Sequence, residues 1–214
     1  ELELAARSLP SPVRLSHLHW GGGTPTLLSP ALMDRLSNEL RKIFIFDQDL
    51  EFSVEIDPTE LDQERCNMLK KIGMTRASVG IQDFNIGIQR IIGRDQSYDQ
   101  TQAAIEMLRD AGITSVNADI VFGLPDQTPK RLSDTVQKLL SLSPDRVALY
   151  GYAHVPWMAK RQALIPKEKL PTPVERLRLF ETAQDMFLWD GYDAIGIDHF
   201  ARPDDSMTKA AKVG

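Results

Sequence analysis

The stretch His-Trp-Gly-Gly-Gly-Thr-Pro-Thr at residues 19–26 is the most informative part of this sequence. It follows an apolar run and precedes a helix start, with Ser29 as the expected N-cap and Pro30 at the first helical position. Consecutive glycines adopt backbone torsions that other residues avoid, and their N–H groups can approach a ligand closely. Such a turn suits a carboxylate or a phosphate. The ending of a phosphate-binding P-loop is absent, which leaves another kind of ligand turn or an ordinary strand-to-helix turn.

Strand-like and helix-like segments alternate along the rest of the chain. We predict strands at residues 15–20, 50–56, 77–81, 116–122 and 146–150, and a last strand that runs through Ile197. We predict helices at residues 61–72, 86–92, 98–111 and 130–142, and a further helix that ends near Gly191. This alternation predicts right-handed βαβ units in one parallel sheet, and the lack of a Rossmann glycine fingerprint favours a barrel or partial barrel. A complete eightfold barrel takes about 250 residues, so this chain suits only part of one.

The overall composition limits the classes of function. The chain has 214 residues, 42% of them hydrophobic, and a formal net charge of -5 without charged blocks. Nucleic acids and anionic membranes require a basic face, so neither is an expected partner. The longest apolar run is far below the roughly 18 residues of a membrane span. A single cysteine fits a reducing cytoplasm, which is the expected location.

Several residues are predicted to be structural. Cys66 lies within a predicted helix and reads as a buried thiol. His17 and His19 share one strand face without a suitably spaced third ligand, so we expect core or rim packing and no metal site. The helix that follows Ser29 is predicted to bury one stripe of apolar side chains at four-residue spacing, namely Leu32, Leu36, Leu40 and Phe44. We also predict that Met186, Phe187 and Trp189 lie in the core.

Polar side chains stand where the predicted strands end. The carboxyl ends of parallel barrel strands form the ligand site in such folds. Asp119 interrupts an apolar strand, where a charge without a partner is costly, so a ligand-facing role is favoured over a structural one. The collective pattern is a stronger signal than any one residue. Its members are Glu55 and Asp57, Gln82 and Asp83, Asn117 and Asp119, His154, and Asp198 with His199.

The motifs at residues 19–26, 53–58, 80–84, 119–125, 152–156 and 198–205, in this order, resemble those of the oxygen-independent coproporphyrinogen III oxidases. These enzymes are members of the radical S-adenosylmethionine (AdoMet) superfamily. The resemblance extends from about Leu15 to Asp205. Gly-Gly-Gly-Thr-Pro alone indicates only the wider superfamily. The block Ile-Asp-His-Phe-Ala-Arg-Pro-Asp-Asp at residues 197–205 is much more specific.

The resemblance implies an α/β fold, a partial (β/α)6 TIM-like barrel of the radical AdoMet type with a parallel sheet and its first strand missing. Residues 1–214 would form this one domain, incomplete at the N-terminus, with residues 165–214 leading toward a C-terminal domain. Residues 1–7 read as the end of a helix already under way. The family holds a [4Fe–4S] cluster through three cysteines in a CxxxCxxC loop, which this sequence lacks. No metal ligand is therefore assigned, and the chain alone is expected to be inactive.

The resemblance also implies a reaction in porphyrin and haem biosynthesis. Coproporphyrinogen III would be oxidatively decarboxylated to protoporphyrinogen IX by a 5′-deoxyadenosyl radical, with two AdoMet molecules per chain. The expected electron donor is a reductant of the flavodoxin type. A monomer is the default expectation for the oligomeric state.

The family's motifs assign roles to particular residues. The resemblance implies that Gly22, Gly23 and Thr24 line the AdoMet sites, and that Glu55 holds polar groups of the AdoMet at the cluster. The alternative for Glu55 is a charge at a helix N-terminus, and for Arg94 a solvated surface charge. No catalytic residue is assigned. The residues implied to contact the second AdoMet are Gln82, Arg94, Asp119 and Ala153.

Two other functions stay in view. A haem-binding or haem-delivering relative shares the glycine-rich loop, although its usual Glu-Ala-Asn-Pro motif reads Glu-Ile-Asp-Pro here, at residues 55–58. An unrelated phosphate-binding barrel enzyme would use Gly21–Gly23 as a phosphate nest, but no glycine-rich loop with a helix N-terminus follows near Gly196. Fold alone does not separate these functions.

Overall fold

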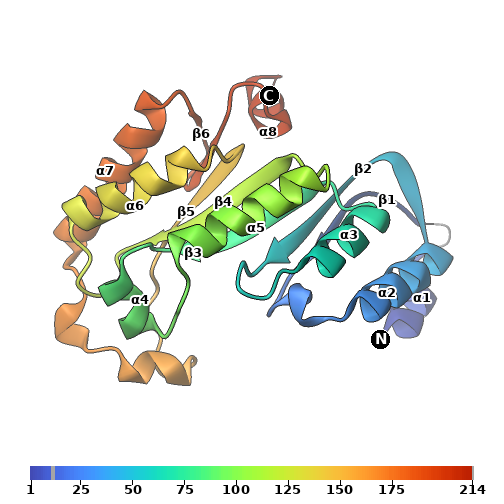
Figure 1. The fold of residues 1–214 in the computed structure, drawn as a ribbon, viewed down its shortest axis with the longest axis horizontal. Coiled ribbons are helices and arrows are strands. Elements are labelled where there is room, and N and C mark those ends of the chain that lie inside the picture. Colours follow the sequence, from blue (N-terminus) through green and yellow to red (C-terminus); the bar gives the residue numbers. More distant parts are fainter. Residues whose placement is uncertain (11–12, 214) are drawn as a thin grey trace. The chain divides into compact units, whose positions relative to one another are not determined.

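The computed structural model describes residues 1–10 and 13–213, which form two compact units (Figure 1). The first unit comprises Glu1–Val79 and Ala103–Val116, and the second comprises Gly80–Gln102 and Asn117–Gly214. Two strands and one helix begin in one unit and end in the other. They are β3 (Arg76–Gln82), α5 (Tyr98–Asp110) and β4 (Ser115–Phe122).

The first unit is a parallel sheet with helices packed on it. Its strands follow the order β1-β2-β3, and both pairings are parallel. Helices α2 and α3 lie side by side, as Figure 1 shows. Besides parts of β3, α5 and β4, the unit contains α1 (Leu2–Ser8), β1 (Val13–Trp20), the 3₁₀ turn η1 (Pro25–Leu27), α2 (Pro30–Ile43), β2 (Phe44–Ile56) and α3 (Gln63–Lys71).

The start of α2 confirms the expected capping. The Ser29 side chain accepts a hydrogen bond from the backbone N–H of Leu32, and Pro30 occupies the first helical position. The predicted stripe is wrong at its N-terminal end, because Leu32 is 47% exposed while Met33 and Leu40 are buried. A strict four-residue spacing drifts around a helix of 3.6 residues per turn.

Strand β2 is longer than predicted, because it begins at Phe44 directly after α2. Phe44 already has extended backbone torsions, and β-favouring residues follow it. Its C-terminal half alternates as expected, with Phe52, Val54 and Ile56 buried. The opposite face of this half therefore presents the side chains of residues 51, 53 and 55.

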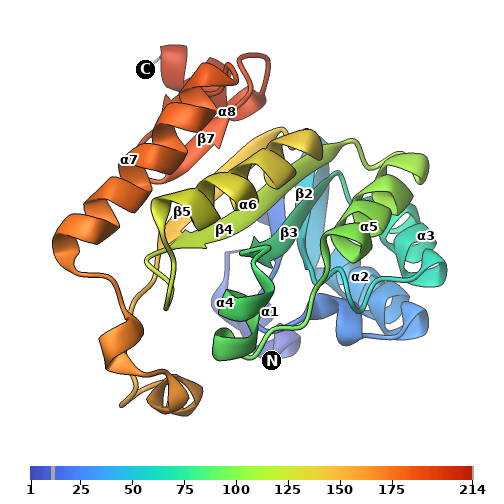
Figure 2. The ribbon, with the colours of Figure 1, turned by 60° about the vertical axis from the view of Figure 1, so that its left-hand side comes forward.

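The second unit has parallel and antiparallel strands. Its order is β4-β5-β7-β6, with β4 and β5 parallel. Helices α6 and α7 run side by side (Figure 2). Besides parts of β3, α5 and β4, the unit contains α4 (Ile86–Ile92), α6 (Pro129–Ser141), β5 (Arg146–Gly151), the 3₁₀ turns η2 (Lys160–Leu164) and η3 (Lys167–Lys169), α7 (Pro173–Trp189), β6 (Asp193–Ile195), β7 (His199–Ala201) and α8 (Ser206–Val213).

The prediction of a last parallel strand through Ile197 is wrong. Strand β6 ends at Ile195, and β7 returns antiparallel to it and to β5. Gly196 has a φ of 73°, which allows the chain to reverse there, and Ile197 is 90% exposed. His199 consequently opens an antiparallel strand and does not follow the end of a parallel one. The α/β class with a mostly parallel sheet is confirmed.

The aromatic residues near the end of α7 divide between core and solvent. Phe187 is fully buried, and its ring centroid lies 5.0 Å from that of Phe200. Met186 is half-buried, and Trp189 is 94% exposed, so the prediction of a core position is wrong for Trp189. Within the described ranges, no helix has both the length and the apolar character to cross a membrane.

Thr172→Ala is expected to destabilise the second unit by about 1 kcal/mol. Thr172 and Glu175 form a capping box at the start of α7, in which the Glu175 carboxylate accepts from the Thr172 backbone N–H at 2.7 Å. The loss of the Thr172 hydroxyl leaves the backbone N–H of Glu175 without its acceptor. Thermal unfolding of both proteins measures the difference, with the exposed Lys167→Ala as the control. An unchanged midpoint would exclude the capping contribution.

Candidate functional site

Glu55 and the glycine turn meet in the first unit. Glu55 is the last residue of β2 on the face opposite the core. Its Oε2 accepts a hydrogen bond from the backbone N–H of Gly22 at 3.1 Å. Gly22 has a φ of 76°, a conformation that glycine adopts readily, and the chain turns there. The alternative of a charge at a helix N-terminus is wrong, because α3 begins at Gln63 with Asp62 as its N-cap. The carboxylate is therefore oriented by the turn that follows β1.

His19 supports the same carboxylate from β1. Its Nδ1 lies 2.8 Å from the Ser53 hydroxyl oxygen, and its Nε2 lies 3.4 Å from Glu55 Oε1. Core packing is wrong for His19, since its side chain is 54% exposed, and its contact with Glu55 places it at the rim. His17, whose Nδ1 lies 3.0 Å from the Ser16 hydroxyl, is also exposed. The contact between His19 and Glu55 was not predicted, although side chains at two-residue spacing on neighbouring parallel strands could have indicated it.

The rest of the glycine turn leaves its backbone open. A Cβ placed on Gly22 or Gly23 meets no atom within 4 Å, and Gly23 has a φ of 92°. Thr24 follows, and its carbonyl accepts from the backbone N–H of Leu27 at 3.0 Å. Gly21 differs, because a Cβ there would lie 2.5 Å from His19 Nε2 and 2.6 Å from Glu55 Oε1. The structure thus brings Gly22 and Glu55 into contact, with Gly23 and Thr24 in the same turn.

In the second unit, β3 ends in a tight turn centred on Gln82. The backbone N–H of Asp83 donates to the Ile81 carbonyl at 2.9 Å, and Gln82 has a φ of 68°. This combination is a γ-turn of the strained hand, which is rare for a residue with a side chain. Strain of this kind tends to occur where a side chain must be aimed at a ligand.

Gln82 lines a largely apolar cavity of 860 Å³ in the second unit. This volume lies within the range of cofactor and small-molecule sites. Burial raises the pKa of one lining residue, Tyr152, above its ordinary value, which keeps the phenol protonated. The other lining residues are Arg90, Ile91, Ile92, Gly93, Val121, Leu124, Gln162, Leu164, Ile165 and Pro166.

Arg94 is anchored to the backbone at the end of β3. Its Nη2 donates to the Gly80 carbonyl at 2.7 Å, and its Nε donates to Gln96 Oε1 at 2.8 Å. Gln96 is buried and donates to both the Gly80 carbonyl and the Thr101 hydroxyl. A solvated surface charge is therefore the wrong interpretation for Arg94, which is half-buried.

Asp119 and Ala153 stand on β4 and after β5. Asp119 is half-buried, and its Oδ1 accepts from the side-chain amide of Asn117 at 2.7 Å. Ala153 is exposed, and its carbonyl accepts from Gln162 Nε2 at 3.1 Å. Gln162 also lines the apolar cavity, so Ala153 lies beside that wall. The ligand roles of both residues stay predictions.

A fully buried carboxylate, Asp83, follows Gln82. Its Oδ1 accepts from the Asn85 backbone N–H at 2.6 Å and from the Thr135 hydroxyl at 2.8 Å. Its Oδ2 accepts from Gln127 Nε2 at 2.8 Å. Burial raises the pKa of Asp83, and the hydrogen bonds from Asn85, Gln127 and Thr135 oppose that rise. Asp83 appeared in the sequence pattern, but its two buried partners lie far along the chain and gave no signal.

The remaining residues that the sequence singled out are not part of these two groups. His154 Nδ1 lies 3.3 Å from the Tyr152 hydroxyl, and His199 Nδ1 lies 2.6 Å from Asp198 Oδ1. The prediction of a buried structural thiol is confirmed, because Cys66 is fully buried and donates to the Met107 carbonyl. Burial also raises the pKa of Cys66. The described part of the chain contains no group of three or more His, Cys, Asp or Glu arranged to hold a metal.

Proteins similar to this chain are oxygen-independent coproporphyrinogen III oxidases. The enzyme of Paracoccus denitrificans is 58% identical over 100% of this chain and 48% of its own length. A homologue of that name from Cereibacter sphaeroides is 52% identical over 100% of this chain and 47% of its own length. The chain therefore spans about half the length of the curated relatives it matches.

A solved structure with the same fold comes from the same group of enzymes. The coproporphyrinogen III oxidase from Escherichia coli, described as a radical SAM enzyme, superposes with a TM-score of 0.89 at 40% identity. The match covers 92% of this chain and 45% of that one. The model of the radical SAM superfamily matches residues 1–139, which is more than half of the sequence. The chain, with its glycine turn around Gly22, its Glu55 near the end of β2 and its α/β order, thus belongs to the radical SAM superfamily.

Proposed function

We propose that the whole protein converts coproporphyrinogen III to protoporphyrinogen IX without oxygen, in porphyrin and haem biosynthesis. Each of two propionate side chains would lose a hydrogen atom, CO₂ and one further electron to become a vinyl group. The observation that supports this most strongly is the Glu55 carboxylate, held by Gly22 and flanked by His19, within a chain 58% identical to an oxidase of this name. The chain resembles these relatives over its whole length.

Membership of the superfamily implies S-adenosylmethionine and a [4Fe–4S] cluster as cofactors. The first unit fits AdoMet, because Gly22 and Gly23 leave their backbone open and Glu55 is 42% exposed. A carboxylate at this position accepts hydrogen bonds from ribose hydroxyls or pairs with the ammonium group. AdoMet supplies the hydrogen-abstracting radical when it is bound and reduced. Gly22, Gly23, Thr24 and Glu55 would hold it.

The described residues do not fit the cluster. Cys66 is the single cysteine, and it is buried within α3 with its thiol donating to a backbone carbonyl. A cluster ligand must be a deprotonated thiolate at an accessible position, and burial raises the pKa of this thiol. Cys66 is therefore not a ligand of the cluster.

In this proposal the second unit would hold a second AdoMet molecule and the substrate. Gln82 projects from a strained turn at the wall of the 860 Å³ cavity, which supports a ligand role for its amide. Arg94, Asp119 and Ala153 complete the proposed second AdoMet site. The apolar lining would exclude water from the reacting propionate, while Arg90 at the same wall provides a cation for a carboxylate. We further propose a flavodoxin-type electron donor, a cytoplasmic location and a monomer.

The whole protein, reconstituted without oxygen, is expected to form protoporphyrinogen IX from coproporphyrinogen III. The assay contains AdoMet, a reductant and an electron acceptor, and porphyrins are separated by chromatography after oxidation. A boiled sample and a sample without AdoMet are the controls. A protein that has an intact cluster and binds haem stoichiometrically, but forms no vinyl product, would overturn the oxidase and favour a haem-delivering relative.

A further inference from the structure

We propose that Asp83 is a positioning residue that fixes one wall of the 860 Å³ cavity in the second unit. The wall contains Gln82, Val121 and Leu124. This inference rests on the proposed function, because the ligand of that cavity is the substrate or the second AdoMet. Asp83 itself is fully buried and does not line the cavity.

The first connection is through the backbone at the end of β3. Asp83 donates its N–H to Ile81, which closes the turn that strains Gln82. The Asp83 carbonyl accepts from the buried Gln89 side chain at 2.7 Å. Its carboxylate is fixed by Asn85 and by Thr135 of α6. The backbone N–H and the carbonyl of Asp83 are both held in this way, so Gln82 cannot relax to a favourable φ without breaking the hydrogen bond that closes its turn.

The second connection runs through Gln127 to the turn after β4. Gln127 donates to Asp83 Oδ2 at 2.8 Å and to the Val121 carbonyl at 3.0 Å. Its Oε1 accepts from the backbone N–H groups of Gly123 at 2.7 Å and Leu124 at 3.3 Å. The carboxylate fixes the orientation of this amide, because only Nε2 can donate to Asp83. The amide in turn fixes two residues of the turn, of which Leu124 lines the cavity.

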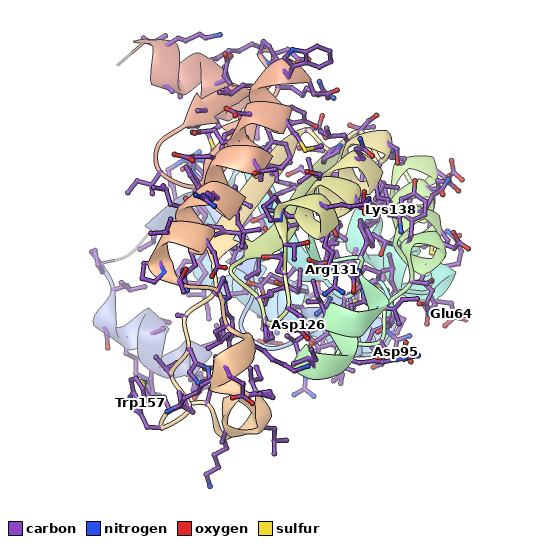
Figure 3. All side chains as sticks on the ribbon, turned by 90° about the vertical axis from the view of Figure 1, so that its left-hand side faces the viewer. Glu64, Asp95, Asp126, Arg131, Lys138 and Trp157 are labelled. Carbon is purple, nitrogen blue, oxygen red and sulfur yellow. The ribbon has the colours of Figure 1, made fainter. Side chains whose placement is uncertain are left out.

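The charged form of Asp83 is supported from α6. Thr135 donates its hydroxyl proton to Asp83 Oδ1 and accepts from the Phe84 backbone N–H at 3.2 Å. Arg131, one turn earlier on α6, favours the negative charge electrostatically and donates to the Asp126 carbonyl. Figure 3 labels Arg131 in the first turn of α6 and Asp126 in the turn before that helix. The network is satisfied at each of these atoms, which makes it a rigid support.

Asp83→Asn in the whole protein tests the proposal. The variant keeps the shape but places Nδ2 against Gln127 Nε2, so two donors face each other. Gln127 must then rotate, and Gly123 and Leu124 lose their acceptor. We expect faster hydrogen exchange of both backbone N–H groups, and a KM for coproporphyrinogen III raised about tenfold or more with a smaller change in kcat.

The double variant Asp83→Asn with Gln127→Glu provides the rescue. The introduced glutamate can accept from the introduced asparagine with one carboxylate oxygen and from the Gly123 N–H with the other, at unchanged net charge. It cannot donate to the Val121 carbonyl as Gln127 does, so the expected recovery is partial. Gln127→Glu alone places two carboxylates together and should be worse than either other variant. Recovery of slow exchange and of KM in the double variant supports the proposal. No recovery in either measurement overturns it.

Leu139→Ala is the matched control for a loss of stability. Leu139 is fully buried on α6 and is not a hydrogen-bond partner of Asp83, so its truncation destabilises the same helix and leaves the hydrogen bonds of the carboxylate in place. We expect its KM to stay within about twofold of the wild type. If Asp83→Asn does not fold, Thr135→Val removes one hydrogen bond of the carboxylate and should shift exchange and KM in the same direction.

The outcomes separate the two hypotheses. A wild-type protein that forms no vinyl product overturns the proposed function alone, because hydrogen exchange is measured without substrate and still decides the role of Asp83. Exchange at Gly123 and Leu124 that is equal in Asp83→Asn and the wild type overturns the positioning role. Equal KM changes in Asp83→Asn and Leu139→Ala also overturn it, since a purely structural role predicts them.

Discussion

Glu55→Ala in the whole protein is expected to abolish reductive cleavage of AdoMet while the fold stays intact. The carboxylate is held by the Gly22 N–H at 3.1 Å and is 42% exposed, so the substitution removes a ligand group and no core packing. A charge-assisted hydrogen bond contributes about 1.5–3 kcal/mol, so the loss of one weakens AdoMet binding about tenfold or more. The rate of 5′-deoxyadenosine formation and equilibrium binding of AdoMet measure the effect.

Two further variants make this test specific. Glu55→Gln retains an oxygen that can accept from Gly22 but removes the charge, so its loss should be smaller than that of Glu55→Ala. Glu64→Gln on α3 changes an exposed carboxylate of the same unit and should behave as the wild type. Wild-type rates in Glu55→Ala would show that Glu55 does not bind AdoMet.

Gly21→Ala should lose about a hundredfold in AdoMet cleavage, the scale expected for a misplacement of about 1 Å. Its Cβ would lie 2.5 Å from His19 Nε2 and 2.6 Å from Glu55 Oε1, so both side chains must move. These atoms are the ends of exposed side chains, and their movement costs little stability. We therefore expect lost activity at a nearly unchanged melting temperature, measured by 5′-deoxyadenosine formation and thermal unfolding.

Gly87→Ala serves as the control for Gly21→Ala. Gly87 lies within α4, where alanine is favoured over glycine, and its added Cβ would lie 3.1 Å from the Asn85 side chain. It should leave AdoMet cleavage intact. If Gly21→Ala is as active as Gly87→Ala, the close approach of His19 and Glu55 to Gly21 is not required for AdoMet cleavage.

The sequence predicted the features that follow from local periodicity. The alternation in β2 placed Glu55 on the face opposite Phe52 and Val54, and the structure confirms this arrangement. The cap at Ser29 and the buried Cys66 were also predictable, because both depend on neighbours along the chain. A ligand turn was one of two interpretations of the glycine stretch, and the open backbone at Gly22 and Gly23 supports that one.

Features that depend on contacts between distant residues were not predictable. The hydrogen bonds from Gln127 and Thr135 to Asp83 join residues that only the fold brings together. The reversal at Gly196 was missed because three-residue strands are too short to show a period. The exposure of Trp189 depends on where α7 ends against its neighbours, which composition does not indicate.

The outer strands of the two units differ in how many backbone groups they offer for pairing with another strand. Strand β1 is the outer described strand of the first unit and is eight residues long, whereas β6 is the outer strand of the second unit and has three. A long outer strand offers many backbone donors and acceptors to a further strand, and a short one offers few. The described residues of β1 therefore offer a longer edge for an added strand than those of β6. Arg14, an exposed charge on β1 paired with Asp47, disfavours a purely apolar strand at this edge.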